Sequence, residues 1–317
     1  SPVRRMTIER YTPAMQPEWD EFAATARNAT FLHRRGYMDY HADRFTDHSL
    51  IARGDDGRIL ALLPANAEGG TLVSHRGLTY GGWLTPARRF TAATMLGLFA
   101  DMRSFLRAAG FATLVYRPVP HIYHSVPAED DIYALWRNGA VADAVGASST
   151  IDLRRPRLLD HGSKNAINRA MRSGAVFGRS HDFKAFWGVL EEVLARHHNA
   201  RPVHSLDEML LLHDRFPDEI RLYTASVEGR VEAGVVVYSC GTVAHAQYTA
   251  AGPTARRMRL LPALYAYIMD NDCDGMEWFD IGTSCEQGGH YLNEGLDAQK
   301  AGLGGRCTVY TSYRMQL

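Results

Sequence analysis

The sequence predicts an α+β protein made of two tandem domains, each with a mixed, mostly antiparallel sheet flanked by helices. The first observation is an internal repeat: residues 48–75 and 220–245 both alternate three apolar strands with an acidic-Gly-Arg turn and a Gly-Thr turn. The second observation is a long helical stretch after each copy, at 90–109 and 255–272, with a short apolar strand behind it. A repeat that accounts for about half the chain indicates two copies of one fold.

Composition and charge narrow the class of protein. The chain has 317 residues, which suits two domains of ordinary size. Hydrophobic residues make up 46% and charged residues 22%, as in a globular chain. Lys and Arg together number 35, as do Asp and Glu, so the formal net charge is zero. A neutral chain argues against a strongly basic nucleic-acid binder, although a local basic patch is compatible with it.

The cysteines and the hydropathy pattern predict a cytoplasmic protein. All four cysteines lie in the second half, and no two form a close Cys-x-x-Cys pair, so we expect neither a zinc site nor a disulfide framework. A reducing compartment fits this use of cysteine. The first residues lack the apolar run of a signal peptide, and no stretch approaches the ~20 apolar residues that span a bilayer. We therefore expect no membrane insertion.

The first half, residues 1–153, reads as the N-terminal domain. Pro17 suits the first turn of a helix, and Trp19, Phe22 and Ala23 recur behind it at helical spacing. The expected elements, in order, are a strand at 6–11, helices at 17–28 and 37–45, the three repeat strands, a helix at 91–108, a strand at 112–117, a helix at 129–138 and a strand at 148–153.

The second half, residues 154–317, reads as the C-terminal domain and begins with a basic linker around Pro156. Phe186, Leu190 and Val193 give one of its helices an apolar face. The expected elements are a basic helix at 163–174 that ends at a glycine, helices at 183–198 and 206–215, the repeat strands at 220–249, a helix at 255–272, a strand at 276–280 and a final strand at 307–314.

Three features of the second half resemble the GNAT acyltransferase fold, and more narrowly its FemAB-like branch. They are the basic helix SKNAINRAMRSG at 163–174, the strand and helix HAQYTAAGPTARRMRLLPALYAYIMD at 245–270, and the strand end FDIGTS at 279–284. Lys300 and a Gly-Gly-Arg run follow them. The resemblance covers nearly the whole chain. It implies a tandem GNAT protein with a degenerate N-terminal copy and a catalytic C-terminal copy that transfers an acyl or aminoacyl group to an amine.

The segment before the second long helix departs from the acetyl-CoA-dependent members of this family. Those members carry an Arg/Gln-x-x-Gly-x-Gly/Ala loop, whose N–H groups and helix N-terminus bind pyrophosphate. Residues 252–260 read GPTARRMRL and lack the internal glycines, so Arg256, Arg257 and Arg259 are the candidates to bind a phosphate instead. The resemblance implies acetyl-CoA or another acyl-CoA as co-substrate, and the family also includes users of aminoacyl-tRNA.

Acyl transfer to an amine needs a base for the amine and a proton source for the leaving thiolate. His204 is a candidate base because its ordinary pKa is near neutrality, and it shares a predicted loop with Arg201, a candidate substrate ligand. In another interpretation, His204 and Ser205 cap the next helix. Asp280 ends an apolar strand before a glycine turn, where it is a second candidate base or else forms an Asx-turn.

The third repeat strand of the second half carries polar side chains. Alternation places His245 and Gln247 on one face and the catalytic candidate Tyr248 on the other. Two polar residues on one face of an apolar strand indicate either substrate binding or a buried pair whose members satisfy each other. Further candidate substrate ligands follow along the chain: Ser284, Glu286, Tyr291 and Lys300.

The basic helix has two interpretations. Lys164, Arg169 and Arg172 form either a solvated face or a contact with tRNA or a nucleotide-linked substrate.

We therefore predict an N-acyltransferase that moves acetyl from acetyl-CoA to the primary amine of a small molecule, such as an amino sugar or an amino-acid-like metabolite. The amine attacks the thioester directly after His204 or Asp280 removes its proton, without a metal. Two other functions fit the sequence. One is aminoacyl transfer from tRNA to a cell-envelope precursor, as in the FemAB-like branch; the other is ligand binding by a non-catalytic tandem GNAT protein.

Overall fold

The computed structural model describes residues 6–41 and 43–317, which form two compact units. Unit 1 contains the described residues up to Gly146, with Cys285–Tyr291 and Val309–Leu317. Unit 2 contains Ala147–Ser284 and Leu292–Thr308.

The C-terminal end of the chain belongs to unit 1, which differs from the continuous division expected at residues 153 and 154. The cause is the length of two strands, β8 (Val141–Asp152) and β16 (Arg306–Gln316), each of which has one end in each unit. In unit 1, β16 pairs antiparallel with β7 from Tyr313 opposite Tyr116 onward.

Unit 1 is organised around helix α3 (Ala92–Ala108). Thr91 caps this helix by accepting a hydrogen bond from the N–H of Thr94 at 3.2 Å, and the buried face of α3 shares one apolar core with the strands. Its strands run in the orders β1-β3-β4 and β2-β5-β6-β7-β16. The other elements are β1 (Thr7–Arg10), α1 (Gln16–Thr25), α2 (Arg35–Met38), β2 (Thr46–Asp47), β3 (Leu50–Arg53), β4 (Ile59–Leu63), β5 (Asn66–Glu68), β6 (Thr71–Ser74), β7 (Thr113–Tyr116), α4 (Asp130–Arg137) and β14 (Cys285–Glu286), which pairs with β15 (Tyr291–Leu292).

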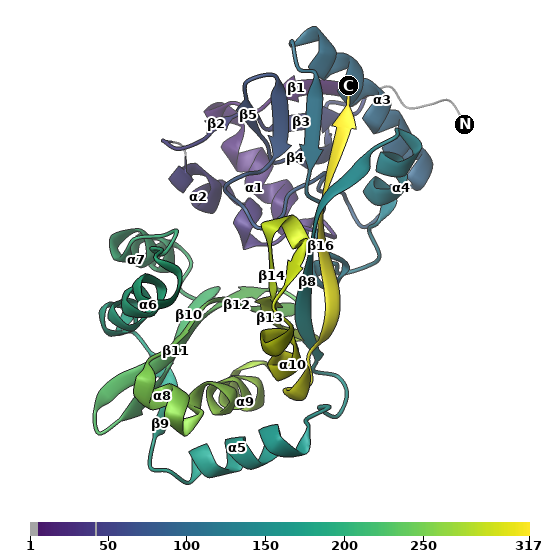
Figure 1. Ribbon diagram of the computed structural model, residues 1–317. Coiled ribbons are helices and arrows are strands. Elements are labelled where there is room, and N and C mark those ends of the chain that lie inside the picture. The colour runs from purple at the N-terminus through teal and green to yellow at the C-terminus, as the bar shows by residue number, and fades with distance from the viewer. Residues whose placement is uncertain (1–5, 42) are drawn as a thin grey trace. The chain divides into compact units, whose positions relative to one another are not determined.

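Unit 2 is a sheet with helices on both faces, and in it the strands run β16-β8-β13-β12-β11-β10-β9. Helices α5 and α9 lie on one side of this sheet, and α6 and α7 lie on the other (Figure 1). The elements are α5 (His161–Met171), β9 (Val176–Ser180), α6 (Phe183–His198), α7 (Leu206–Arg215), β10 (Ile220–Val227), β11 (Arg230–Cys240), β12 (Val243–Ala251), α8 (Pro253–Met258), α9 (Leu260–Asp272), β13 (Trp278–Thr283) and α10 (Glu294–Gly302). The predicted α+β architecture with a mixed sheet flanked by helices is confirmed.

The two faces of the unit 2 sheet pack against their helices through alternate residues of β11. Val235 and Val237 belong to the apolar core that includes Leu264 of α9. Gly234 faces α6, and a Cβ at this position would lie 2.3 Å from the ring of Phe186. Only a glycine allows α6 to pack this closely, so the sequence of β11 sets the position of the helix.

The helix expected at 255–272 is two helices. Arg259, between α8 and α9, adopts the left-handed conformation at φ 53° and ψ 48°, which ends the first helix and redirects the chain into the second. Across the described residues, we find no helix with the length and apolar character that crossing a bilayer requires.

Candidate active site

The candidate site begins where two parallel strands of unit 2 separate. β12 and β13 pair from Val243 opposite Trp278 to His245 opposite Asp280. Both strands continue past that point, but no further pair joins them within the described part of the chain. His245 and Asp280 therefore lie at the apex of a gap between the strands.

A β-bulge in β12 decides which side chains share a face. On the neighbouring β11, Val236 pairs with Tyr248, but the next residue pairs with Ala246. Gln247 is therefore an extra residue. The bulge puts Tyr248 on the same face as His245, whereas strict alternation predicted opposite faces and grouped His245 with Gln247. The side-chain Oε1 of Gln247 is buried and has no hydrogen-bond partner among the described residues.

The face that His245 and Tyr248 share is the one that α6 covers. The ring of Tyr248 packs edge-on against Trp187 of α6, with ring centroids 5.3 Å apart. Thr249 lies on the opposite face, where its hydroxyl accepts a hydrogen bond from Tyr265 of α9 at 3.2 Å. Side chains of β12 thus line both sides of the sheet beside the gap.

Asp280 and His245 form a hydrogen-bonded pair. His245 Nδ1–H donates to Asp280 Oδ2 at 2.9 Å. The other carboxylate oxygen accepts from the Ser148 hydroxyl on β8 at 2.6 Å and from the Gly282 N–H at 3.3 Å. Asp280 is 0% exposed and the His245 side chain is 14% exposed. A buried carboxylate with these partners orients the imidazole and leaves Nε2 as the ring nitrogen that can meet a substrate.

The carboxylate of Asp280 is fully buried and is hydrogen-bonded to His245, whose side chain is partly exposed. The reason is the strand order, which places β13 between β12 and β8 and lets both neighbours supply partners. The hydrogen bond from Gly282 shows that the expected local turn is also present.

His204 lies in the loop between α6 and α7, where Tyr248 holds it. The Tyr248 hydroxyl accepts from the backbone N–H of His204 at 3.2 Å and lies 2.5 Å from its Nδ1. Trp187 Nε1–H donates to the carbonyl of His204 at 3.3 Å. Ser205 caps α7 by accepting from the N–H of Glu208 at 3.1 Å, the capping role offered by the alternative interpretation of this loop.

A hollow of about 560 Å³ opens beside this loop. Arg201, His204 and Glu208 line it, so the structure brings together the two residues that the sequence singled out here. Glu208 is an addition that the sequence analysis missed. Burial raises the pKa of the Glu208 carboxyl above its ordinary value.

A second hollow, of about 550 Å³, lies at the far end of β12 beside α9. The end of β12, the junction of α8 and α9, and α10 line it. Its charged lining residues are Arg256, Arg259 and Lys300, and none of the described residues that line it is a carboxylate. A lining that combines three cations with no carboxylate favours an anionic ligand such as a phosphate. Arg257 is exposed and is not among the lining residues.

The stretch 252–260, which lacks internal glycines, is folded as helix α8 and its junction with α9. The N–H of Arg256 donates to the carbonyl of Gly252 at 3.0 Å, and the N–H of Arg259 donates to the carbonyl of Arg256 at 3.1 Å. These amides are therefore already bonded within the chain. The cationic side chains are the groups that remain for a phosphate.

Lys300 enters the same hollow from α10 and is tied to the end of β13. Its Nζ donates to the carbonyls of Gly282 at 3.1 Å and Thr283 at 3.0 Å. The positive charge of Lys300 is thereby fixed on the β13 side of the gap, whereas Arg256 and Arg259 come from the α8–α9 junction.

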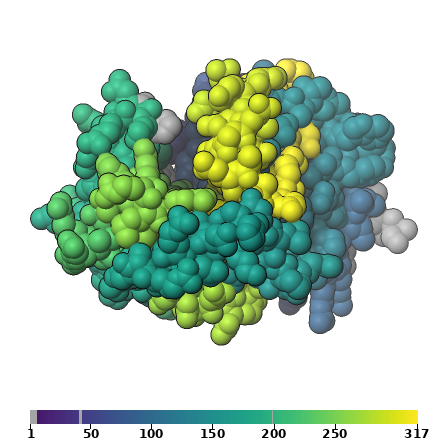
Figure 2. All heavy atoms as spheres, turned by 60° about the horizontal axis from the view of Figure 1, so that its bottom comes forward, coloured from purple at the N-terminus to yellow at the C-terminus, as the bar shows by residue number. Residues whose placement is uncertain are grey.

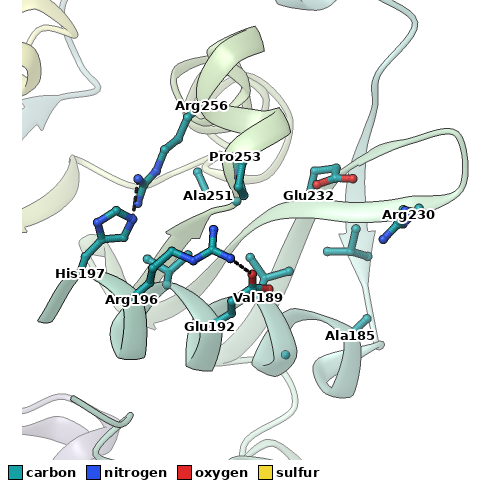
Figure 3. A pocket seen from close by; sticks show the side chains of 14 residues that line it. Ala185, Val189, Glu192, Arg196, His197, Arg230, Glu232, Ala251, Pro253 and Arg256 are labelled. Atoms are coloured by element: carbon teal, nitrogen blue, oxygen red, sulfur yellow. Dashed lines mark hydrogen bonds and ion pairs between the residues drawn. The ribbon is translucent and has the colours of Figure 1, made fainter. Parts of the chain in front are cut away.

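A groove of about 560 Å³ adjoins this hollow and shares Arg256 with it (Figure 3). Arg256 reaches from α8 toward His197 of α6, with its Nη1 2.7 Å from the imidazole Nε2. Glu192 and Arg196 of the same helix form an ion pair at 2.8 Å. The Arg256 side chain therefore lies where the two depressions meet.

Three of the predicted substrate ligands are absent from the lining of both hollows. Ser284 is buried; its N–H donates to the carbonyl of Ala147 at 3.3 Å, and its hydroxyl has no hydrogen-bond partner among the described residues. Glu286 and Tyr291 are exposed and belong to the segment of the chain that groups with unit 1.

Two hydroxyl residues of β8 complete the surroundings of Asp280 and were missed from the sequence. The Thr150 hydroxyl donates to Thr308 Oγ1 at 3.0 Å and lies 3.5 Å from Asp280 Oδ1, beside the bond from Ser148. The run Ser148-Ser149-Thr150 inside a strand was the available signal, because consecutive buried hydroxyls need partners.

A comparison with family models finds a match in the second half of the chain. Residues 161–291 match the acetyltransferase (GNAT) domain, a range that includes His204, His245, Tyr248 and Asp280. A search of curated proteins gives no match.

Solved structures share the fold over almost the whole chain. FemX has a TM-score of 0.70 at 11% identity, over 98% of this chain and 97% of that one. L-PGS from Bacillus licheniformis has a TM-score of 0.62 at 14% identity, over 97% and 92%. A tandem GNAT protein from the clavulanic acid biosynthesis pathway has a TM-score of 0.55 at 15% identity, over 98% of each chain. The predicted tandem GNAT fold, similar to that of FemX, is thus confirmed.

Proposed function

We propose that unit 2 of this tandem GNAT-fold chain transfers an acyl group from acyl-CoA to the primary amine of a small molecule, with acetyl-CoA as the first candidate donor. The observation that carries the proposal is the hollow lined by three cations beside the gap between β12 and β13. A donor whose phosphates bind there can extend its thioester toward the apex of the gap, where His245 and Asp280 lie.

The donor's phosphates are assigned to Arg256, Arg259 and Lys300. Guanidinium groups bind phosphate oxygens through paired N–H donors, and an ammonium group adds a compact charge. This arrangement substitutes side chains for the backbone amides of the usual glycine loop. It also explains why three cations line one hollow in a chain whose net charge is zero.

The chemical step is assigned to His245, with Asp280 as its positioning residue. The imidazole Nε2 accepts a proton from the amine, whose nitrogen lone pair attacks the thioester carbonyl carbon. The new C–N bond forms, the C–S bond breaks, and coenzyme A leaves as a thiolate that takes up a proton. Asp280 stabilises the imidazolium that forms during this step, because its carboxylate is bonded to Nδ1–H.

The amine acceptor is assigned to the α6 face of the sheet. His245 and Tyr248 point to this face, and Arg201 and Glu208 line the hollow beside it. A cation and a carboxylate in one hollow suit a small polar amine, such as an amino sugar or an amino-acid-like metabolite. The four cysteines are free, which supports a reducing compartment such as the cytoplasm.

A second candidate donor is aminoacyl-tRNA, with a cell-envelope precursor as acceptor. The observation in its favour is that α8 occupies the place of the glycine loop, so the backbone amides that hold a CoA pyrophosphate in related enzymes are bonded elsewhere. The fold shared with FemX is compatible with this candidate.

Calorimetric titration with acetyl-CoA tests the first donor. We expect saturable binding by the wild type and binding weakened about tenfold or more in Arg259→Ala, since a charge-assisted bond to phosphate is lost. Arg257→Ala is the matched control, because this neighbouring arginine is exposed and outside the hollow. Equal weakening in both variants would place the phosphates elsewhere.

The remaining outcomes separate the other functions. Absence of binding by the wild type would reject acyl-CoA, and aminoacyl-tRNA binding with a steep dependence on salt would then support the second donor. Binding of acetyl-CoA without product from any amine in a broad panel would support a non-catalytic ligand-binding protein.

A further inference from the structure

Helix α5 carries a polar face composed of hydrogen-bond donors. At 100° per residue, Lys164, Arg169 and Arg172 fall within an arc of about 140° on this helix and its C-cap. The other exposed side chains in this arc are amides and an imidazole, from Asn165, Asn168 and His161. The opposite side of α5 is buried in unit 2 through Ser163, Ala166 and Ala170. The helix therefore presents a fixed basic face to solvent.

The positive charge of this region is concentrated within a chain that is neutral overall. Between Leu153 and His181 the only carboxylate is Asp160, which accepts a hydrogen bond from the Ser163 N–H at 2.7 Å and so caps α5. The seven cations of the same stretch are Arg154, Arg155, Arg157, Lys164, Arg169, Arg172 and Arg179.

The cations of the linker are neutralised, but those of α5 are not. Arg154 and Arg155 pair with Asp152, and Arg157 pairs with Asp270. Lys164, Arg169 and Arg172 make no ion pair with any residue that the structure describes. Three uncompensated charges on one rigid face create a local positive field that attracts an anionic partner.

Exposed aliphatic side chains flank the same helix. Leu158, two residues before the cap of α5, is 59% exposed, Met171 at its last turn is 42% exposed, and Val176 just beyond it is 68% exposed. In Figure 2 the segment that contains α5 (teal) lies at the surface that faces the viewer. We name the combination of these three aliphatic residues with Lys164, Arg169 and Arg172 the α5 surface.

We propose that the α5 surface docks on an anionic lipid bilayer as a peripheral contact. Cations attract the anionic headgroups, and the exposed aliphatic side chains before, at the end of and after α5 enter the interface between headgroups and acyl chains. Single-stranded RNA fits less well, because surfaces that bind it combine cations with exposed aromatic side chains for base stacking, and the exposed apolar residues here are aliphatic. This docking is independent of the donor and acceptor proposed above.

Co-sedimentation of the full chain with vesicles tests the proposal. The vesicles contain either phosphatidylcholine alone or phosphatidylcholine and phosphatidylglycerol in equal parts. We expect binding that requires phosphatidylglycerol and falls as salt is added. The variant with Lys164→Gln, Arg169→Gln and Arg172→Gln should bind the vesicles about a hundredfold more weakly, since each of the three cations contributes a similar part of the free energy of binding to an anionic surface.

A matched control removes the same net charge elsewhere. The substitutions Arg58→Gln, Arg88→Gln and Arg107→Gln affect three exposed arginines of unit 1 and should leave vesicle binding unchanged. Circular dichroism verifies that both triple variants keep their helices. Equal losses in the two variants would show that net charge alone governs binding, and would overturn the α5 surface as a specific site.

The aliphatic residues distinguish lipid from RNA. Leu158→Gln with Met171→Gln and Val176→Thr should weaken vesicle binding further at high salt, where the charges are screened. The same variant should not affect any affinity for a tRNA. Binding of wild type to tRNA without binding to phosphatidylglycerol vesicles, or equal binding to both kinds of vesicle, would overturn the proposal.

Discussion

The parallel strand pair of unit 1 is closed, whereas the corresponding pair of unit 2 opens. In unit 1, β6 and β7 pair over Thr71–Ser74 and Thr113–Tyr116, and a further bridge joins Gly81 to Pro118. The loop after β6 thus folds back over the strand end. In unit 2, the pairing of β12 with β13 stops at His245 opposite Asp280.

The polar groups at the two strand ends have different partners. In unit 1 the Tyr116 hydroxyl donates to Asp131 at 2.8 Å and accepts from the Trp83 N–H at 2.6 Å, and a Cβ on Gly82 would touch its ring. A hollow of only about 120 Å³ lies nearby at Arg117. In unit 2 the His245–Asp280 pair lies at the apex of a gap, and a hollow of about 550 Å³ lies at the far end of β12. The two strand ends therefore differ: that of unit 1 is filled by side chains of the same unit, whereas those of unit 2 are left apart.

Replacing His245 should have the largest effect on activity. We expect His245→Ala to lower kcat by about a hundredfold or more, because a general base is removed, and to lower the free energy of unfolding by about 1–3 kcal/mol, because the buried Asp280 carboxylate loses its imidazole partner. Steady-state kinetics and urea denaturation measure the two quantities.

Asp280→Asn should lower kcat by up to the same factor as His245→Ala, since the amide oxygen accepts from Ser148 and Gly282, its NH2 group then donates to His245 Nδ1, and the proton left on Nε2 removes the base. An unchanged kcat in His245→Ala would contradict the assignment of the site to unit 2.

The closed strand end of unit 1 requires the backbone at Gly81 to lie very close to the backbone at Ser74. A Cβ there would lie 2.3 Å from the carbonyl oxygen of Ser74, and the backbone cannot move away without breaking the hydrogen bond of Gly81 N–H to Arg117 at 2.7 Å. We expect Gly81→Ala to lower the free energy of unfolding by about 2–4 kcal/mol, measured by urea denaturation.

Gly97→Ala in α3 is the control in the same unit. Its new Cβ would meet only the end of Met6 at 3.5 Å, an ordinary contact, and alanine favours the helix. A loss of acetyl-CoA binding in folded Gly81→Ala would show that unit 1 takes part in the site and would break the contrast between the units.

The buried Asp131 should make unit 1 sensitive to pH. Burial raises the pKa of its carboxyl to about 7, well above the ordinary value. Because the folded state binds this proton more tightly than the unfolded chain does, protonation of Asp131 stabilises the fold. This contribution is complete below the carboxyl pKa of the unfolded chain, near 4, and is lost as the pH rises to about 7. The free energy of unfolding of the wild type should therefore decrease relative to Asp131→Asn over this window, by about 1.4 kcal/mol per pH unit at most. Parallel urea titrations of both proteins at several pH values measure this; a constant difference would refute it.

Local signals in the sequence predicted the elements well. The expected helices at 183–198 and 206–215 have the same bounds as α6 and α7, because Asp182 and Ser205 provide caps before clear apolar periods. The tandem repeat likewise predicted the three strands β10, β11 and β12 followed by a helical stretch and β13, but the expected order lacked β5, β9 and α10. These features depend on neighbouring residues, which a sequence displays directly.

The arrangement of the site depends on features of the fold that the local sequence does not indicate. Nothing in the strand sequence marks Gln247 as an extra residue, so the face of Tyr248 was predicted incorrectly. Ser148 reaches Asp280 across 132 positions of the chain, and Arg259 takes a left-handed conformation that a non-glycine residue seldom adopts. Register and long-range pairing decide such features, and tertiary packing selects them.

Replacing one tyrosine in each unit by phenylalanine tests the difference between the two strand ends, with smaller expected effects. Tyr248→Phe removes both hydrogen bonds that hold His204 in the α6–α7 loop, so we expect the KM for the amine to rise about fivefold with kcat nearly unchanged. Tyr116→Phe makes the same chemical change in unit 1, where it removes partners of Trp83 and Asp131. It should lower the free energy of unfolding by about 1–2 kcal/mol and leave both kinetic constants unchanged.

A large loss of kcat in Tyr248→Phe would instead identify its hydroxyl as the proton source for the leaving thiolate. The α6–α7 loop would then belong to the chemical step, and the site would extend beyond the His245–Asp280 pair.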